Sequence, residues 1–171
     1  MSGLSSAPVP DLLPDDHLRG PAGAPLLIEY GDLACPYCAV LHVTAADLVL
    51  AGRVRWVFRH FPSRSARPRA WPLACAAEAA SLQGRFWEFH DAVLCGQGRI
   101  DDPHLWEHAT HLGLDLERFE RDRRSQAITE RVQRDFDTAV RAGVVATPTV
   151  FAAGTPHNGE ELAALLSGLQ P

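Results

Sequence analysis

Residues 25–38, PLLIEYGDLACPYC, decide the fold, because an apolar run leads directly into two cysteines three positions apart. The run predicts a buried strand, and the spacing of apolar residues from Pro36 onward predicts a helix. At the start of a helix, Cys35 and Cys38 lie one turn apart, so their sulfurs can form a small disulfide or open to a dithiol. The unpaired N–H groups there favour a thiolate, and Pro36 fits the first helical position. The stretch therefore predicts a redox dithiol.

Composition limits the alternatives. A chain of 171 residues suits one domain, or a small domain with an insertion, and 46% hydrophobic residues can form a core. With 21 acidic and 16 basic residues the net charge is −5, which argues against nucleic acid as the main partner. All 16 basic residues are arginine. The missing lysine excludes a Walker lysine, a Schiff-base lysine and a lysine general base.

The N-terminal sequence predicts a location. Residues 1–8 have neither a positive start nor an apolar segment, and no run approaches the ~18 apolar residues of a membrane helix. We therefore expect a soluble, cytoplasmic protein without membrane contact, in which a cysteine pair is more often catalytic or metal-binding than structural. A start codon assigned too late would hide a signal peptide, so an exported or periplasmic protein is the alternative.

The pattern along the chain predicts an α/β domain interrupted by helices. Residues 1–24 read as a flexible lead-in, or as one that becomes ordered on contact with the rest of the chain. A strand over 25–31, a helix from 36 to Gly52 and a half-buried strand over 53–59 predict a right-handed parallel βαβ unit. A strand over 149–152, a turn at residues 154–155 and a helix over 160–169 follow later. We assign residues 25–63 and 143–171 to one domain and 64–142 to an inserted helical domain.

The inserted segment shows several helical stretches and no strand. Helices are expected over 70–82 and 85–94, and a third is expected to be capped by Asp101 or Asp102. Apolar residues then recur every four positions on the longest helix, ended by Gly143; they are Ile128, Val132, Phe136 and Val140.

Glu29 lies six positions before Cys35, on the strand that leads into the motif. Strand alternation aims its side chain under the helix, near Cys38. A carboxyl buried there would have a raised pKa and could accept or return the proton of the Cys38 thiol. The alternative is an exposed glutamate at a strand end that forms a surface ion pair.

Further motifs carry a family resemblance. Residues 144–149, VVATPT, resemble the cis-proline loop of thioredoxin-fold proteins. Together with CPYC, Glu29 and the helical insertion, they make the chain similar to DsbA-like thiol:disulfide oxidoreductases. The similarity covers roughly residues 17–169, and its further motifs are Gly20-Pro21, Ile28-Glu29-Tyr30-Gly31-Asp32, Arg59-His60-Phe61-Pro62 and 84–91, GRFWEFHD.

This resemblance implies a thioredoxin-like fold with an all-helical insertion, and a role for each site residue. Cys35 would be the exposed attacking cysteine and Cys38 the buried resolving one. Pro148 would be a cis-proline facing the disulfide, and Thr147 would present its backbone to an extended substrate. The implied partners are a protein or peptide bearing a disulfide and a thiol or electron-transfer partner, with no cofactor besides the cysteine pair.

Two other functions and the direction of reaction stay open. The same CPYC tetrapeptide fits a glutathione-linked, glutaredoxin-like enzyme, and a lone CxxC also fits a metal-binding or redox-inactive scaffold. Pro36 and Tyr37 supply no donor comparable to a histidine, so we expect a less oxidising pair than the strongest oxidases have. In the cytoplasm the pair should donate electrons more often than it accepts them.

The chain departs from the family pattern in three places. Arg67 precedes Pro68 where many relatives have histidine. Ala146 stands where glycine is frequent, and the short segment 154–159 predicts a reduced final strand.

Other chemically active side chains have simpler interpretations. Cys75 and Cys95 read as two buried small hydrophobic residues; a disulfide between them and regulatory thiols are the alternatives. His104, His108 and His111 predict a solvated helix face, with a metal site as the alternative. Packing roles are expected for His42 and His60, with an effect on local charge as the alternative. Core packing is also expected for an aromatic cluster of Phe86, Trp87 and Phe89, with substrate contact as the alternative.

Overall fold

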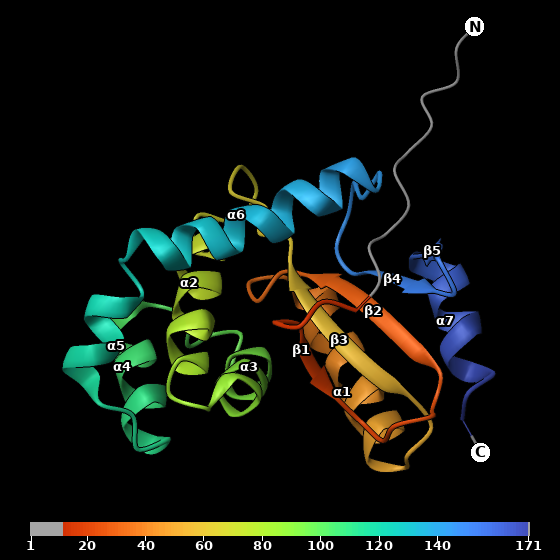
Figure 1. Cartoon of the computed structure of the whole chain (residues 1–171), viewed down its shortest axis with the longest axis horizontal. Helices are drawn as coiled ribbons and strands as arrows, with labels where there is room; N and C mark the ends of the chain where they lie inside the picture. The colour runs from red at the N-terminus through yellow and green to blue at the C-terminus, as the bar shows by residue number, and fades with distance from the viewer. Residues whose placement is uncertain (1–11, 171) are drawn as a thin grey trace, which may run out of the picture.

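The computed structural model describes residues 12–170, so the expectation about residues 1–8 lies outside it. Within this range a five-stranded sheet has the order β1-β3-β2-β4-β5, with helices on both faces and a group of helices at one side (Figure 1). This is the expected thioredoxin-like fold with a helical insertion.

The predicted βαβ unit is present. Strand β2 (Leu26–Gly31), helix α1 (Pro36–Leu50) and strand β3 (Arg55–His60) follow one another, and β2 and β3 are parallel. The expectation of a half-buried second strand is wrong, since all of β3 after Arg55 is buried. Strand β3 lies between β1 and β2 in the sheet. Because both faces of the sheet are covered there, the alternation of polar and apolar residues does not correspond to one exposed face.

Within residues 12–24, the prediction of a flexible lead-in is wrong, and the alternative of a segment ordered by contact is confirmed. His17–Arg19 form strand β1, which pairs antiparallel with β3 in the register His17 to Phe58. Just before it, Asp16 accepts two hydrogen bonds from Arg59, at 2.8 and 2.7 Å. A three-residue strand has too little periodicity to be recognised in sequence, and it is held by partners about forty residues away.

The C-terminal part completes the sheet. Strand β4 (Thr149–Ala152) is antiparallel to β2 and pairs with the short strand β5 (Thr155–His157), and α7 (Gly159–Ser167) follows. The turn between β4 and β5 places Ala153 and Gly154 at positive φ, 48° and 81°. The final strand is short, as predicted.

Five helices form the segment between β3 and β4. They are α2 (Ala70–Ser81), α3 (Phe86–Cys95), α4 (Asp102–His111), α5 (Leu116–Asp122) and α6 (Gln126–Arg141). Asp101 is the residue before α4, but neither it nor Asp102 makes the expected side-chain cap. Side-chain caps occur instead where none was predicted: Asp115 accepts a hydrogen bond from Arg118 N–H, and Ser125 accepts one from Ile128 N–H.

Helix α6 runs from the helical group across to the sheet (Figure 1). Its buried residues are Ile128, Val132, Asp135 and Ala139, whereas Val140 is exposed. Four residues turn a helix by about 400°, which is about 40° more than one full turn. Residues spaced by four therefore rotate gradually away from the face that packs against the rest of the protein. The predicted four-residue stripe is therefore correct only at its start.

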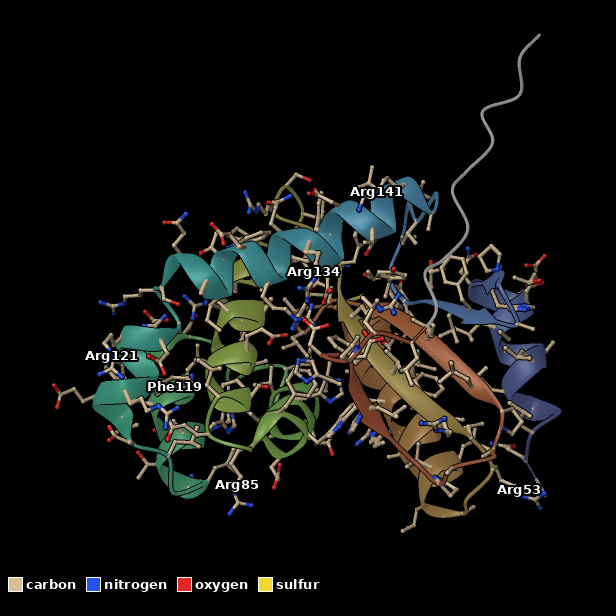
Figure 2. All side chains as sticks on the ribbon, viewed as in Figure 1. Arg53, Arg85, Phe119, Arg121, Arg134 and Arg141 are labelled. Carbon is tan, nitrogen blue, oxygen red and sulfur yellow. The ribbon has the colours of Figure 1, made fainter. Side chains whose placement is uncertain are left out.

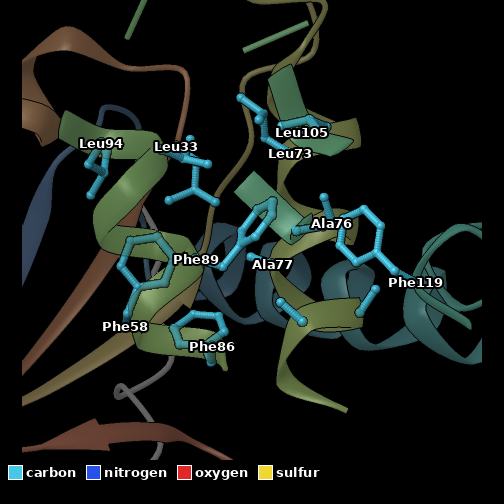
Figure 3. Close-up of a cluster of buried hydrophobic side chains, with 14 of the residues drawn as sticks. Leu33, Phe58, Leu73, Ala76, Ala77, Phe86, Phe89, Leu94, Leu105 and Phe119 are labelled. Carbon is cyan, nitrogen blue, oxygen red and sulfur yellow. The ribbon is translucent and has the colours of Figure 1, made fainter. Parts of the chain in front are cut away.

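One core joins the sheet to the helical group. Phe58 of β3 lies 6.1 Å from Phe86 between ring centres, and Phe89 lies 5.7 Å from Phe119 (Figure 3). Each such ring contributes about 1.5–3 kcal/mol when fully buried. Cys35 and Cys38 belong to the same cluster, so the helical group is packed directly against the dithiol.

The two faces of the sheet have separate cores. Leu27 and Trp56 face α1 and α7, whereas Ile28 and Tyr30 face the end of α6. This alternation places Glu29 on the α1 side, as predicted from strand periodicity. Figure 2 shows that Arg53, Arg85 and Arg121 lie at the periphery of the molecule, far from one another.

Candidate active site

The two cysteines lie at the start of α1. Cys35 is the residue before the helix, with extended backbone (φ −93°, ψ 120°), and Pro36 occupies the first turn. The Cys35 carbonyl accepts from Ala39 N–H at 3.1 Å. Both sulfurs are free thiols. The sequence places them here because proline is tolerated only where a helix N–H needs no partner.

The surroundings of Cys35 favour its thiolate. Hydrogen bonding by Cys38 is the largest influence and lowers the pKa of Cys35 to about 5, against the effect of burial. Thr147 and the positive charge of Arg67 lower this pKa further. A thiol with such a pKa is mostly thiolate at neutral pH, and the thiolate is the nucleophile in disulfide exchange.

Cys35 is nevertheless buried, which corrects the expectation of an exposed attacking cysteine. Its exposed fraction is 0%, while the neighbouring Tyr37 is 70% exposed. The Cys35 sulfur lies 3.5 Å from the carbonyl oxygen of Thr147, and its side chain belongs to the core cluster. The loop before β4 therefore covers the Cys35 sulfur. The sequence pattern could not show this contact, because the loop and the cysteine lie far apart in the chain.

Cys38 is held in the opposite protonation state. Burial, Cys35 and Glu29 raise its pKa well above that of an ordinary thiol. The backbone N–H of Asp32 donates to its sulfur at 3.4 Å. The pair thus consists of one stabilised thiolate and one protonated thiol.

Glu29 lies buried on the α1 side of β2, and the alternative of an exposed surface glutamate is wrong. Trp56 Nε1 donates to its Oε2 at 2.9 Å, while Oε1 has no hydrogen-bond partner among the described residues. Burial raises the pKa of Glu29 to about 7, despite the hydrogen bond from Trp56. A side chain at Gly31 would approach Oε1 to 2.6 Å, so this glycine leaves room for the carboxyl group.

The loop before β4 faces the dithiol. The Thr147–Pro148 peptide bond is cis, and Thr147 contacts Cys35 as described. Beside it lies a largely apolar groove of about 590 Å³ between α1 and α7. Its lining includes Tyr37, Val40, Ala146, Pro148 and Leu162. The groove opens beside the residues expected to bind substrate.

Asp32 is a site residue to which the sequence analysis assigned no role. Its Oδ1 accepts from Ala34 N–H at 2.8 Å, and its Oδ2 accepts from Ser63 N–H at 3.1 Å and from Arg67 Nη1 at 3.2 Å. The signal was an aspartate at the end of a buried apolar run, where a charged side chain needs partners.

Among residues 12–170, two groups of histidine and carboxylate side chains lie close enough together to hold a metal ion. They are His17, His60 and Glu78, and His42, His90 and Asp91; neither contains Cys35 or Cys38. In the first, both imidazoles contact Glu78 Oε1, at 2.7 and 3.0 Å. His60, expected only to pack, is therefore part of a polar network.

Arginines already neutralise both carboxylates. Arg19 donates to Asp91 at 3.0 and 3.1 Å, and Arg131 lies 3.9 Å from Glu78. A guanidinium at this distance opposes a divalent cation on the same carboxylate, so we interpret both groups as hydrogen-bond networks. On α4, His104 and His108 are half-buried and only His111 is exposed, so the predicted solvated face is correct only at His111.

The other two cysteines differ from each other. Cys75 is buried and Cys95 is exposed, and both are free. The expectation of a buried residue is confirmed for Cys75 and wrong for Cys95, which is the last residue of α3. The alternative of a disulfide between them is also wrong. The aromatic cluster packs as predicted, with Phe86 and Phe89 buried.

Comparison with known proteins defines the class. Residues 13–168 match the family model described as Thioredoxin, so the chain belongs to the thioredoxin family. A thioredoxin-like oxidoreductase from Silicibacter pomeroyi superposes with a TM-score of 0.80, at 28% identity and 91% coverage of both chains. The α-DsbA1 of Wolbachia pipientis gives 0.76 at 23% identity and 92% coverage of both, which shows the shared fold.

The curated relatives are longer proteins. The chain is 45% identical over 149 residues to a Na(+)/H(+) antiporter NhaA of Herminiimonas arsenicoxydans, and 41% identical over 146 residues to NhaA 1 of Salinispora arenicola. Each match covers 84% of this chain but only 23% and 22% of those proteins. Within residues 12–170 of this chain, we find no helix long and apolar enough to cross a membrane.

Proposed function

We propose that this chain is a thiol:disulfide oxidoreductase that exchanges disulfides with protein or peptide substrates through Cys35 and Cys38. The observation that carries the proposal is that the two neighbouring thiols differ in acidity. The pKa of Cys35 is lowered to about 5, whereas the pKa of Cys38 is raised. The thioredoxin-like fold with a DsbA-like helical insertion supports this class of reaction. A scaffold role would not require two such different thiols.

In the reducing direction, the Cys35 thiolate attacks one sulfur of the substrate disulfide. A Cys35–substrate disulfide forms, the substrate S–S bond breaks, and the other substrate sulfur leaves as a thiolate that takes a proton. Cys38 then gives its proton to Glu29 and attacks the Cys35 sulfur. The Cys35–Cys38 disulfide forms, the second substrate thiolate leaves, and the substrate has gained two electrons.

Glu29 suits the proton transfer because its pKa of about 7 lies near neutral pH. The unpartnered Oε1 is free to accept the proton of Cys38 and to return it when the reaction runs in the oxidising direction. Glu29 also raises the pKa of Cys38, so the two groups are electrostatically coupled.

Thr147 and Pro148 are proposed to receive an extended substrate beside the dithiol. The Thr147 carbonyl oxygen, which lies 3.5 Å from the Cys35 sulfur, would accept a hydrogen bond from a backbone N–H of the substrate in a short β-augmentation. The neighbouring groove would take apolar side chains of the substrate.

The direction of the reaction depends on the reduction potential. A lowered Cys35 pKa stabilises the reduced pair, which favours oxidation of substrate dithiols. This is the opposite of the electron-donating use that the predicted cytoplasmic location implies. Equilibration of the cysteine pair with reduced and oxidised glutathione measures its reduction potential. That value decides whether the pair oxidises substrate dithiols or reduces substrate disulfides.

Reduction of insulin by the dithiol form tests the function. We expect wild type and Cys95→Ser, which alters an exposed thiol outside the pair, to be active, and Cys35→Ser to be inactive. Equal activity of Cys35→Ser and wild type would refute the proposal. Turnover with glutathione as the only thiol would favour the glutaredoxin-like alternative.

A further inference from the structure

The carboxyl group of Glu29 is held by one oxygen. Trp56 Nε1 on β3 donates to Oε2 at 2.9 Å, and both side chains are buried. Among residues 12–170, Oε1 has no hydrogen-bond partner. An indole N–H donates and cannot accept, so Oε2 accepts from Trp56 whether Glu29 is charged or neutral. A proton on Glu29 therefore belongs on Oε1, because an O–H at Oε2 would point one donor at another.

The free oxygen lies beside the two residues that lead to Cys38. A side chain at Gly31 would approach Oε1 to 2.6 Å, so Oε1 lies against this residue of β2. The next residue, Asp32, donates its backbone N–H to the Cys38 sulfur at 3.4 Å. Oε1 and the Cys38 sulfur thus border the same short stretch of backbone, and Oε1 has room there because position 31 is glycine.

Trp56 can hold this arrangement because its own position is fixed. In the sheet it pairs with Arg19 of β1 on one side and with Leu27 of β2 on the other. Its ring is buried in a core cluster with Leu41 and Leu162. A buried indole N–H needs an acceptor, but a neutral oxygen would serve. A carboxyl group is costly to bury, so its use here indicates more than packing.

The groups that act on the titration of Glu29 come from three neighbouring elements. Burial is the largest influence on the pKa of Glu29 and raises it, and the hydrogen bond from Trp56 on β3 is the next and lowers it. Arg19 on β1 lowers this pKa as well, whereas Cys35 at the start of α1 raises it. Burial, Cys35 and Glu29 together raise the pKa of Cys38 on α1. Of these groups, Trp56 is the one that hydrogen-bonds a carboxyl oxygen of Glu29.

We propose that Trp56 is a positioning residue of the dithiol site, which holds Glu29 by Oε2 and keeps Oε1 free as the oxygen that exchanges a proton with Cys38. This inference rests on the proposed function and deepens it, because it assigns the proton to one atom. In the reducing direction the Cys38 S–H proton moves to Oε1, and in the oxidising direction it returns to the sulfur. Without the indole N–H, the carboxyl group could turn and bind a proton on either oxygen.

The first measurement is the pH titration of Glu29, followed by carbon NMR of its carboxyl group in reduced protein that carries Cys35→Ser. This background removes the coupled thiolate, and Glu29→Gln assigns the signal. Loss of a hydrogen bond to the charged form raises a carboxyl pKa, so we expect the Trp56→Phe midpoint to rise by roughly one pH unit. Benzothienylalanine at position 56 keeps the ring shape, lacks the N–H and should show the same rise.

The second measurement is the rate of insulin reduction as a function of pH, with the Cys35–Cys38 pair intact. Glu29 must be unprotonated to accept the Cys38 proton, so the rate should rise with pH through the Glu29 midpoint. The Trp56→Phe profile should move to higher pH by the same interval, which at pH 7 is a loss of roughly fivefold. A merely structural role would lower the thermal midpoint and leave both pH profiles in place.

Trp106→Phe is the matched control. Trp106 Nε1 on α4 donates to Glu120 Oε1 at 2.8 Å, but this hydrogen bond is exposed and lies in the helical insertion. The substitution removes the same type of hydrogen bond and should move neither pH profile.

The outcomes separate this inference from the proposed function. If wild type reduces insulin while Trp56→Phe leaves either pH profile in place, the role of Trp56 is refuted and the oxidoreductase stands. The role is also refuted if benzothienylalanine lacks the effect of Trp56→Phe, or if Trp106→Phe has the same effect. If wild type fails to reduce insulin, the proposed function fails together with this inference.

Discussion

Replacing Glu29 by Gln should remove a large pH dependence of stability. The pKa of Glu29 is raised from 4.5 to about 7 in the folded protein. Its contribution is therefore fully present below pH 4.5 and is lost as the pH rises through 7, because the folded state holds its proton more tightly than the unfolded state. The difference between these two values corresponds to about 3 kcal/mol, at about 1.4 kcal/mol for each pH unit.

Urea unfolding of reduced protein at several pH values between 4.5 and 8 measures this effect. The free energy of unfolding of wild type, minus that of Glu29→Gln, should fall by about 3 kcal/mol over this range. Gln can still accept from Trp56, and its NH₂ group would take the place of the unpartnered oxygen. That substitution has a cost of its own, about 1–3 kcal/mol, but this cost does not change with pH.

The control removes the second group that titrates in the same range. Cys35 has a lowered pKa, so its contribution changes with pH in the opposite direction, and the comparison is repeated with Cys35→Ser in both proteins. Parallel stability curves for wild type and Glu29→Gln, in both backgrounds, would refute the buried, proton-binding Glu29. An unfolding free energy of wild type that rises relative to that of Glu29→Gln as the pH increases would also refute the raised pKa of Glu29.

Three further results are expected. Asp16→Asn should lower the free energy of unfolding by about 3–5 kcal/mol in urea titrations, because it removes a buried negative charge that pairs with the buried Arg59 guanidinium at 2.7 Å. In native protein, 5,5′-dithiobis(2-nitrobenzoate) should label Cys95 at once, and Cys75 only after unfolding; rapid labelling of Cys75 would contradict its burial. In urea titrations of the reduced protein, the difference in unfolding free energy between Glu29→Gln and Glu29→Gln with Cys35→Ser isolates the Cys35 thiolate; it should shrink as the pH falls from 9 through 5, and a constant difference over this range would contradict the lowered pKa.

The control for Asp16→Asn is a surface ion pair. Arg85 donates to Glu88 at 2.8 Å, with side chains 51% and 45% exposed. Glu88→Gln should change the free energy of unfolding by less than about 1 kcal/mol. Equal effects of the two substitutions would show that burial does not determine the strength of these pairs.

Much of the fold could be predicted because its signals are local. The apolar run before CPYC, the helix from Pro36 and the strand at residues 149–152 each follow from patterns within about ten residues. Strand β1 could not be predicted, since His17–Arg19 are ordered by pairing with β3 and not by their own periodicity. The same holds for the burial of β3, which depends on its neighbours in the sheet.

The candidate site divides in the same way. The two cysteines, the strand position of Glu29 and the proline before β4 were identified from sequence and family resemblance, and the structure brings them together. The cover over Cys35 and the contact between Asp32 and Arg67 were not predicted. Asp32 and Arg67 are 35 positions apart, and no local pattern specifies such a pair.

The sequence by itself determined the chemistry that this chain can perform: a dithiol at a helix start, with a carboxyl group on the strand before it. Only the tertiary structure decided the protonation states of these groups. Burial raises the pKa of Glu29 and Cys38, while Cys38, Thr147 and Arg67 lower that of Cys35. The physical reason is that a pKa depends on solvent exclusion and on charges within a few ångströms, and folding brings those charges from distant parts of the chain.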